Sequence, residues 1–147
     1  MTLSQKCHYA VRGVLELAGR YRQGPVSAGE VAACQGIPRR FLEVIFNELK
    51  PSGLVESRRG ARGGYRLARD PREITVAEVI RLVEGTLEPV RTDASTAGGE
   101  VPWGARALQE VWDRAGSAVD RVYASVTFHD LVDRERSLRR DVVDYSI

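Results

Sequence analysis

The sequence predicts a mainly α-helical chain with one small β-hairpin wing, an α+β fold class in which helices predominate. Two short helical patterns separated by a glycine turn occupy residues 28–50, and a hairpin with a basic, glycine-rich tip follows them. A long apolar stripe of helical period then covers residues 104–126. Together these features predict a winged helix–turn–helix followed by a long carboxy-terminal helix.

The composition is that of a globular protein. The 147 residues are 29% charged and 43% hydrophobic, and no apolar run approaches membrane length. The first six residues lead into a helix and not into a signal peptide, so we expect a cytoplasmic protein without a membrane partner. Its two cysteines, Cys7 and Cys34, are too few and too far apart to predict a disulfide framework or a zinc site.

Charge is distributed unevenly along the chain, although the net charge is only +2. Residues 1–75 contain 13 basic against 7 acidic side chains, a balance of +6, whereas residues 76–147 contain 9 against 13, a balance of −4. A basic first half indicates a surface that faces a polyanion. Chance scatter of charge over a solvated surface explains the numbers equally well.

The first helix is expected from Ser4, which caps it, to about Tyr21. Its apolar residues recur every three or four positions, and Gly24 and Pro25 stop it. Val26 is expected to form a brief strand or a packing contact before the next helix.

The helix–turn–helix is predicted within residues 28–50. Its first helix opens with a capping box, in which Ser27 accepts a backbone hydrogen bond and Glu30 reaches back. Gly36 suits the left-handed turn, and Pro38 occupies the first position of the second helix. The core-facing side chains of that helix are expected to be Phe41, Leu42, Ile45 and Leu49.

The hairpin is predicted from two alternating runs, residues 54–57 and 65–68, that flank a glycine-rich loop. Three arginines lie at this tip: Arg58, Arg59 and Arg62. The glycines allow the tip backbone to approach another molecule closely. Tyr65 is expected to pack against the base of the hairpin.

A further helix and an irregular segment follow. Thr75 is predicted to cap the helix, with Glu78 completing a second capping box, and Gly85 to end it. Residues 86–102 are polar and aperiodic, which predicts a mobile loop or linker.

The long helix over residues 104–126 would extend roughly 35 Å, more than a small winged domain can cover. A second copy of the same helix is the simplest partner, so we expect a homodimer; the alternative is a helix folded back onto its own domain. Thr127 is expected to cap a short terminal helix, with a frayed tail over residues 134–140.

Several side chains are candidates to contact double-stranded DNA. Arg39 and Arg40 begin the helix that enters the major groove in such motifs, and each can reach a guanine edge or a phosphate. Glu43 can accept from a cytosine amino group or form an ion pair with either arginine. The hairpin arginines can enter a narrow minor groove, and Lys6 and Tyr9 are candidate phosphate contacts.

The predicted organisation has three parts. Residues 1–85 form the winged helix–turn–helix DNA-binding domain, residues 86–103 a flexible loop, and residues 104–147 a dimerisation helix with a tail. No catalytic set is recognisable, because His8 and His129 lack a partner at a known spacing. The sequence therefore predicts a binding protein and not an enzyme.

A set of short motifs, each weak alone, is specific in combination. They are Gly24-Pro25-Val26-Ser27, Gln35-Gly36-Ile37, Phe41-Leu42-Glu43, Gly53-Leu54-Val55 and Gly63-Gly64-Tyr65-Arg66-Leu67. With these motifs the chain resembles the IscR/NsrR/CymR family (the Rrf-two type) of bacterial winged-helix transcription regulators. The resemblance runs from the first residues to about residue 89 and resumes at residues 112 and 126–127.

The resemblance implies a homodimeric repressor that is paired through the long helix and binds a palindromic operator. It also points to Arg39, Arg40, Glu43 and the hairpin arginines as DNA-facing. Many members hold an iron–sulfur cluster with three cysteines in the loop before the long helix. Residues 86–108 contain no cysteine, and thiolates are the ligands that such clusters need. We therefore expect neither that cluster nor another cofactor.

The sensed signal stays open. Cys34, beside the turn, is a candidate for a reactive thiol that couples oxidation to DNA binding, whereas Cys7 lies on the apolar stripe and is expected to be buried and inert. His8 occupies a position where some relatives place an extra cluster ligand; alternatively, it is a surface residue near Arg12 or a DNA phosphate. A small-molecule or protein effector is a further candidate, and a winged module that binds protein is the competing function class.

Overall fold

The computed structural model describes residues 2–85 and 101–145, and helices dominate them. In chain order the elements are α1 (Gln5–Gly19), α2 (Ala28–Gln35), α3 (Arg39–Leu49), a 3-10 turn (Lys50–Ser52), β1 (Val55–Arg58), β2 (Gly64–Leu67), a second 3-10 turn (Pro71–Glu73), α4 (Val76–Glu84), α5 (Ala105–Ala124) and α6 (Phe128–Asp144). The two strands form one antiparallel hairpin. The predicted mainly α-helical fold with a small β-hairpin wing is confirmed.

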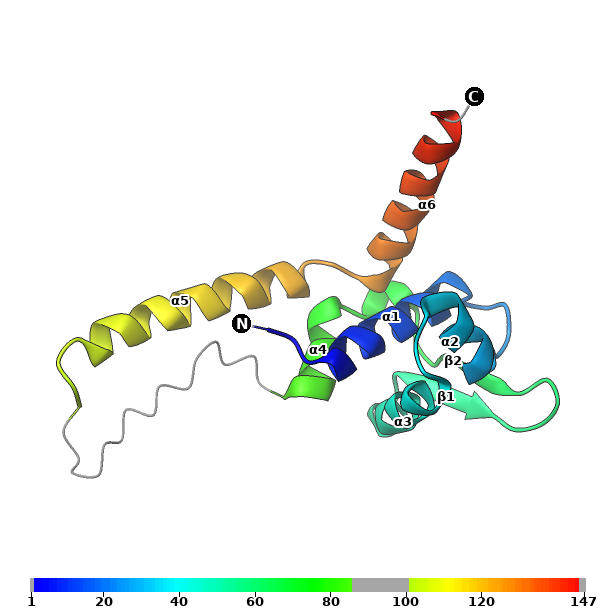
Figure 1. Ribbon diagram of the computed structural model, residues 1–147, viewed down its shortest axis with the longest axis horizontal. Helices are drawn as coiled ribbons and strands as arrows, with labels where there is room; N and C mark the ends of the chain where they lie inside the picture. Colours follow the sequence, from blue (N-terminus) through cyan, green and yellow to red (C-terminus); the bar gives the residue numbers. More distant parts are fainter. Residues whose placement is uncertain (1, 86–100, 146–147) are drawn as a thin grey trace.

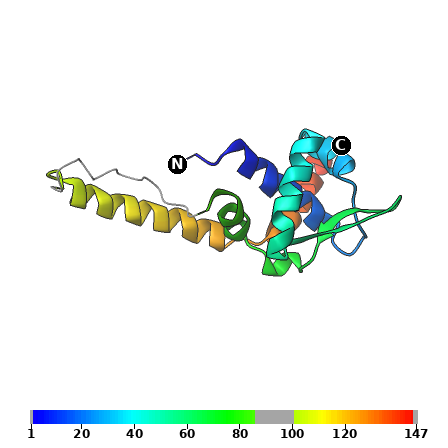
Figure 2. The same ribbon diagram turned by 90° about the horizontal axis from the view of Figure 1, so that it is seen from below.

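The molecule has a body with two projections (Figure 1). Helices α1 to α4 form the body, the loop of the hairpin lies at one end, and α5 extends from the other. The view from below shows the same separation (Figure 2). Helix α5 contacts α4, whereas α6 packs on α1 and then projects away from the body.

Helix α1 runs through the body and contacts α2, α3, α4 and α6. Gly13 faces α3, and a Cβ at this position would lie 2.8 Å from Leu42 Cδ1 and 3.0 Å from the Phe46 ring. The missing side chain therefore lets α1 and α3 approach each other. Phe46 fills the space and is completely buried.

The prediction that Phe41 faces the core is wrong. Phe41 is 43% exposed, whereas Leu42, Ile45, Phe46 and Leu49 are buried. Both phenylalanines lie at the edges of the apolar stripe of α3. The edge that contains Phe46 meets α1 at Gly13, whereas Phe41 lies edge-on against the half-buried ring of Tyr9.

The helix–turn–helix has the predicted turn and a modified cap. Ser27 accepts a hydrogen bond from the Glu30 backbone N at 3.1 Å, and Gly36 ends α2 in the left-handed conformation with φ of 61°. Pro38 precedes α3 with extended backbone, so the helix begins at Arg39 and not at the proline. The expected return contact of Glu30 is replaced by an ion pair with Arg20.

The predicted capping box at Thr75 is modified in the same way. Thr75 accepts from the Glu78 backbone N at 3.2 Å, but the Glu78 carboxylate pairs with Arg69 at 2.5 Å. A guanidinium offers a carboxylate a charge-assisted hydrogen bond, which is stronger than one from a neutral backbone amide.

The wing is joined to the body by backbone hydrogen bonds. Val26 forms an isolated bridge with Tyr65, in which each backbone N donates to the other residue's carbonyl at 2.8 Å. Gly64, with φ of 149°, adjoins this bridge, and a Cβ there would lie 2.2 Å from the Val26 carbonyl oxygen. The brief strand predicted at Val26 is thus present.

The end of the chain returns to the body. Phe128 and Val132 of α6 belong to the main hydrophobic core, and a bridge joins Thr75 to Thr127. The predicted short terminal helix with a frayed tail is wrong, because α6 continues over 17 residues to Asp144. Ion pairs four residues apart, such as Glu135 with Arg139 at 2.9 Å, favour the helical conformation of this polar segment.

The loop predicted over residues 86–103 lies largely outside the described residues. The long helix predicted over 104–126 is present as α5, which ends two residues earlier. The division of the chain into three parts stays a prediction.

Candidate nucleic-acid interface

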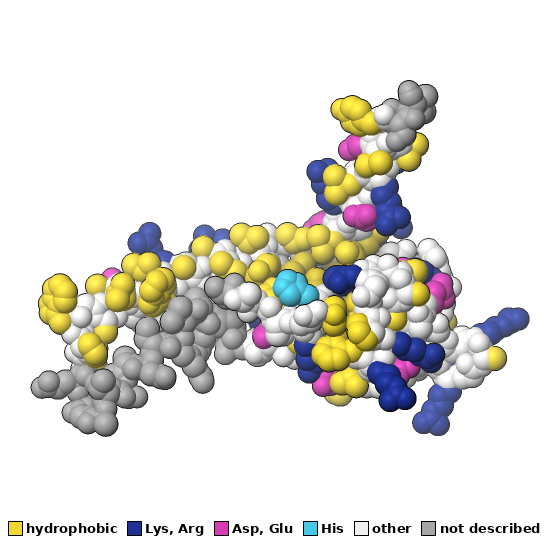
Figure 3. All heavy atoms as spheres, in the orientation of Figure 1, with side chains coloured by type: hydrophobic (Ala, Val, Ile, Leu, Met, Phe, Trp, Pro, Cys, Tyr) yellow, Lys and Arg dark blue, Asp and Glu magenta, His cyan; other side chains and the backbone are white. Residues whose placement is uncertain are grey.

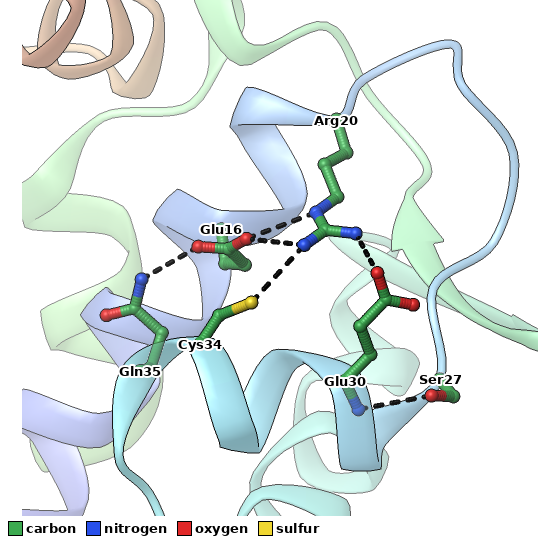
Figure 4. A network of polar contacts seen from close by, with 6 residues as sticks. All are labelled: Glu16, Arg20, Ser27, Glu30, Cys34 and Gln35. Carbon is green, nitrogen blue, oxygen red and sulfur yellow. Dashed lines mark hydrogen bonds and ion pairs between the residues drawn. The ribbon is translucent and has the colours of Figure 1, made fainter.

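A polar network fastens α2 to α1 and so positions the helix that follows the turn (Figure 4). Arg20, which directly follows α1, donates to Glu16 at 3.1 Å, pairs with Glu30, and lies 3.4 Å from Cys34 Sγ. Gln35 donates to the second oxygen of Glu16 at 2.8 Å. Since these side chains are only partly buried, each contact contributes roughly 0.2–1 kcal/mol. Together these contacts hold α2 against α1, and the turn to α3 follows directly from α2.

Helix α3 presents one polar face to solvent. Arg40, Val44 and Asn47 follow one another at steps of four and three residues, opposite the buried stripe, and all three are exposed. We call these three residues the reading face. Val44 and Asn47 were not among the candidates predicted from the sequence; the step of four and three residues from Arg40 was the signal that could have identified them.

Arg39 and Glu43 lie beside the reading face and not at its centre. The Arg39 Nε donates to Glu43 Oε1 at 3.1 Å, and the Arg39 stem lies against Gly29 of α2, with Cδ 3.7 Å from the position of a Cβ there. The ion pair proposed for Glu43 from the sequence is therefore present in the structure. The pair is solvent-accessible, with 68% of the Arg39 side chain exposed, so a phosphate or a base can compete for the arginine.

The tip of the hairpin carries exposed cations. Arg58, Arg59 and Arg62 are all exposed, and within residues 2–85 and 101–145 no carboxylate pairs with any of them or with Arg40. Figure 3 shows basic side chains, in dark blue, projecting from the end of the molecule where Figure 1 places the hairpin loop. An unpaired surface guanidinium is free to bind phosphate or to enter a minor groove.

The base of the wing contacts α3 through Tyr65. Its ring lies 5.0 Å from that of Phe46, between centroids, and its hydroxyl donates to Asn47 Oδ1 at 3.4 Å. Tyr65 thus packs the base of the wing, as predicted, and links the wing to the reading face.

Lys6 and Tyr9 lie on α1 and contact the other edge of α3. Lys6 pairs with Glu48, and the Tyr9 ring meets Phe41 edge-on with centroids 5.6 Å apart. Both side chains are partly exposed. They lie beside α3, and their contact with phosphate stays a prediction.

The two cysteines differ in their environments. Cys7 is buried, and its burial, together with the charge and a hydrogen bond of Glu84, raises the pKa of its thiol to about 11. Cys34 is exposed beside Arg20, and His8 is exposed on α1. Glu84 accepts hydrogen bonds from Ser4, which lower the pKa of its carboxyl. Among the described residues, no three His, Cys, Asp or Glu side chains are grouped so that they could hold a metal ion.

The length and apolar character of a helix decide whether it can cross a membrane. In the part of the chain that the structure describes, no helix has the length and apolar character needed to cross a membrane.

Known proteins share both the sequence and the fold. The model of the Rrf2 family, described as iron-dependent transcriptional regulators, matches residues 3–134. The regulator CymR of Bacillus subtilis is 36% identical over 131 residues, which cover 89% of each chain, and IscR of Photorhabdus laumondii is 33% identical over 94% of this chain and 83% of its own.

Solved structures agree with these matches. The structure of CymR, the global cysteine regulator of B. subtilis, has a TM-score of 0.77 at 34% identity, and the match covers 91% of this chain and 98% of CymR. The IscR structure from T. potens has a TM-score of 0.74 at 34% identity, covering 92% and 88%. From these matches and the geometry above, the chain belongs to the Rrf2 family and is a DNA-binding transcription regulator of the winged helix–turn–helix type.

Proposed function

We propose that the protein is a homodimeric repressor that binds a palindromic operator. The observation that carries the dimer is the surface of α5: Leu108, Val111 and Val122 are 53%, 51% and 61% exposed, and hydrophobic side chains follow this helix in Figure 3. A second α5 would cover them. Two winged units related by a two-fold axis then fit two half-sites of a palindrome.

Each unit would contact DNA at two places. The reading face of α3 would enter the major groove, with Arg39 and Glu43 at its side, and Arg58, Arg59 and Arg62 would reach the minor groove or the phosphates. The absence of competing carboxylates around the wing arginines, among the described residues, supports the second contact. Lys6 and Tyr9 are proposed to contact phosphate beside α3.

The iron dependence in the family description does not fit the residues of this chain. The two cysteines are Cys7 and Cys34; the first is buried, both lie in the winged body, and residues 86–108 contain none. An iron–sulfur cluster needs several thiolates within bonding distance of its irons. We therefore propose that the protein works without the three-cysteine cluster and without another resident cofactor.

The signal must then reach the protein by another route. A cavity of about 570 Å³ lies between α1, α2 and α6 and has Cys34, Glu16 and Arg136 among its lining residues. It supports a small-molecule effector as one candidate, and oxidation of the exposed Cys34 is the other. A protein partner is a third. We assign no catalytic reaction, and we place the protein in the cytoplasm, where its DNA is.

A salt titration tests the proposed binding of DNA by the wing. Affinity for duplex DNA is measured between 50 and 200 mM salt for the wild type, for Arg59→Ala, and for Arg134→Ala, a control that removes the same charge from α6. We expect the slope of log affinity against log salt to fall by about 0.9 for each phosphate that Arg59→Ala no longer neutralises, and to stay unchanged in the control.

Two other results would change the proposal. An unchanged slope and affinity in Arg59→Ala would mean that the wing does not contact DNA. If the wild type bound neither random nor selected duplex in a salt-sensitive way, the protein-binding alternative would replace DNA binding.

A further inference from the structure

The reading face contains a polar side chain that neither the ion pairs nor the proposed wing contacts involve. Asn47 is exposed on α3, one turn after Val44 and two turns after Arg40. The neighbouring carboxylates that could accept from it are directed elsewhere, because Glu43 pairs with Arg39 and Glu48 pairs with Lys6. The Asn47 amide therefore lies between two occupied carboxylates and faces the solvent that a DNA groove would displace.

The orientation of this amide is constrained by the wing. The Tyr65 hydroxyl donates to Asn47 Oδ1 at 3.4 Å. The tyrosine itself is held at both ends, since its ring packs on the buried Phe46 and its backbone forms two hydrogen bonds of 2.8 Å with Val26. A side chain fixed by packing and by a hydrogen bond loses less conformational freedom when it binds.

The remaining hydrogen-bonding capacity of Asn47 has a defined chemistry. The carbonyl oxygen has a second lone pair, and the amino group offers two donors. A donor and an acceptor side by side match adenine, which presents N7 as acceptor and the N6 amino group as donor in the major groove. Guanine presents two acceptors there, and a pyrimidine presents one polar group, so neither uses both ends of the amide.

We propose that Asn47 reads an adenine in the major groove of the operator, and that Tyr65 is the positioning residue that orients its amide. The proposal rests on sequence-specific DNA binding and adds to it a base and a pair of residues. The contact of Tyr65 with α3 would then have a function besides packing, because Tyr65 would orient the side chain that reads the adenine.

The test begins with the sequences that the protein itself selects. The wild-type full-length chain, Asn47→Ala, Tyr65→Phe and Glu48→Gln are each used to enrich binding sites from a pool of random 30-base-pair duplexes. Glu48→Gln is the matched control, since it changes the neighbouring residue on the same helix but lies off the reading face. We expect one adenine preference per half-site to disappear in Asn47→Ala, to weaken in Tyr65→Phe, and to persist in the control.

A single-atom change in the DNA then identifies the contact. The adenine at that position is replaced by 7-deazaadenine, which lacks the N7 acceptor. We expect wild-type affinity to fall roughly 5- to 150-fold, because the Asn47 amino group is then left without its acceptor in the complex. The same replacement should leave the affinity of Asn47→Ala unchanged, and non-specific affinity for random duplex should be equal in both proteins.

Three results would overturn the inference. The first is that Asn47→Ala enriches the same sequences as the wild type. The second is that 7-deazaadenine reduces the affinity of the wild type and of Asn47→Ala equally. The third is that Asn47→Ala loses affinity uniformly on every sequence, as expected if Asn47 and Tyr65 only stabilise the fold. If the wild type enriched no sequence at all, the proposed operator binding would fail, and the inference would fail with it.

Discussion

In the winged body the large apolar side chains of α1 and α3 are mostly buried. In α5, by contrast, the only buried residue among those described is Gly116, which has no side chain. Helix α1 contacts α2, α3, α4 and α6, whereas the main contact of α5 within the described residues is with α4. Fully burying one Val or Leu contributes about 1.5–3 kcal/mol, against a total stability of about 5–15 kcal/mol for a typical domain. The body can therefore be stable through its own contacts, whereas α5 leaves apolar side chains exposed, which a second α5 would cover in the proposed dimer.

The largest expected effect is in the body. Replacing Phe46, which is completely buried, with alanine leaves a cavity at the crossing of α1 and α3 and should reduce the free energy of unfolding by about 3–5 kcal/mol. Phe41→Ala is the matched control on the same helix, with an expected loss of about 1 kcal/mol from its contact with Tyr9. Urea denaturation followed by circular dichroism measures both. Equal losses would show that Phe41 also belongs to the core.

The second effect should separate assembly from folding. Val111→Asp and Val122→Asp place a charge on the exposed apolar side of α5 and should each raise the dissociation constant of the proposed dimer by roughly 10- to 150-fold. Val143→Asp on α6, where the valine is 62% exposed, is the matched control and should leave the dimer intact. Analytical ultracentrifugation measures the association. Dissociation in Val143→Asp alone would indicate that the interface is formed by α6 and not by α5.

A smaller effect is expected where α6 returns to the body. Thr127 and Asp130 form a reciprocal capping box, with hydrogen bonds of 3.1 and 2.9 Å. Thr127→Ala should cost about 1 kcal/mol, and Thr127→Ser should retain most of the stability. The hydrogen bonds from Thr127 lower the pKa of the Asp130 carboxyl, so its contribution is complete at neutral pH and is lost as the pH falls below about 4. A thermal melt at pH 7 and at pH 3 compares the variants; an equal loss in alanine and serine would exclude the hydroxyl cap.

The smallest expected effect concerns Cys7, whose thiol should stay unlabelled in the native protein. The raised pKa of Cys7 keeps its thiol protonated at neutral pH, and burial shields it, so a thiol reagent should label only Cys34 in the native protein. Cys7 should stay protected in Val111→Asp and become labelled faster in Phe46→Ala. Mass spectrometry of labelled protein over time provides the measurement. Rapid labelling of Cys7 in the α5 variant would mean that the body depends on the dimer.

Local sequence signals predicted the parts of this fold whose geometry depends on neighbouring residues. Ser27 and Gly36 define the turn because a hydroxyl cap and a left-handed glycine act within a few residues. The alternating runs around the glycine-rich loop predicted the hairpin for the same reason. The arginines of its tip were identifiable from their position alone, although their contact with DNA stays a prediction.

The burial and the partners of several side chains could be determined only from the tertiary structure. Phe41 and Phe46 both lie at helical steps from buried residues of α3, and the space that Gly13 of α1 leaves is filled by Phe46. The carboxylates of Glu30 and Glu78 satisfied the capping-box pattern, but arginines distant in sequence pair with them. In the sequence Asn47 has no feature that separates it from other polar residues of the helix, and its contact with the Tyr65 hydroxyl depends on the position of the hairpin.

The sequence by itself thus determined the family, the order of the helices and hairpin, and the cationic tip, because propensity, capping and turn chemistry act over a few residues. The missing cysteines of residues 86–108 were equally evident from the sequence. Only the tertiary structure decided which phenylalanine is buried, how far α6 continues and which side of α3 is exposed. Those outcomes depend on contacts between segments far apart in the chain, and a helical period specifies a face without specifying what covers it.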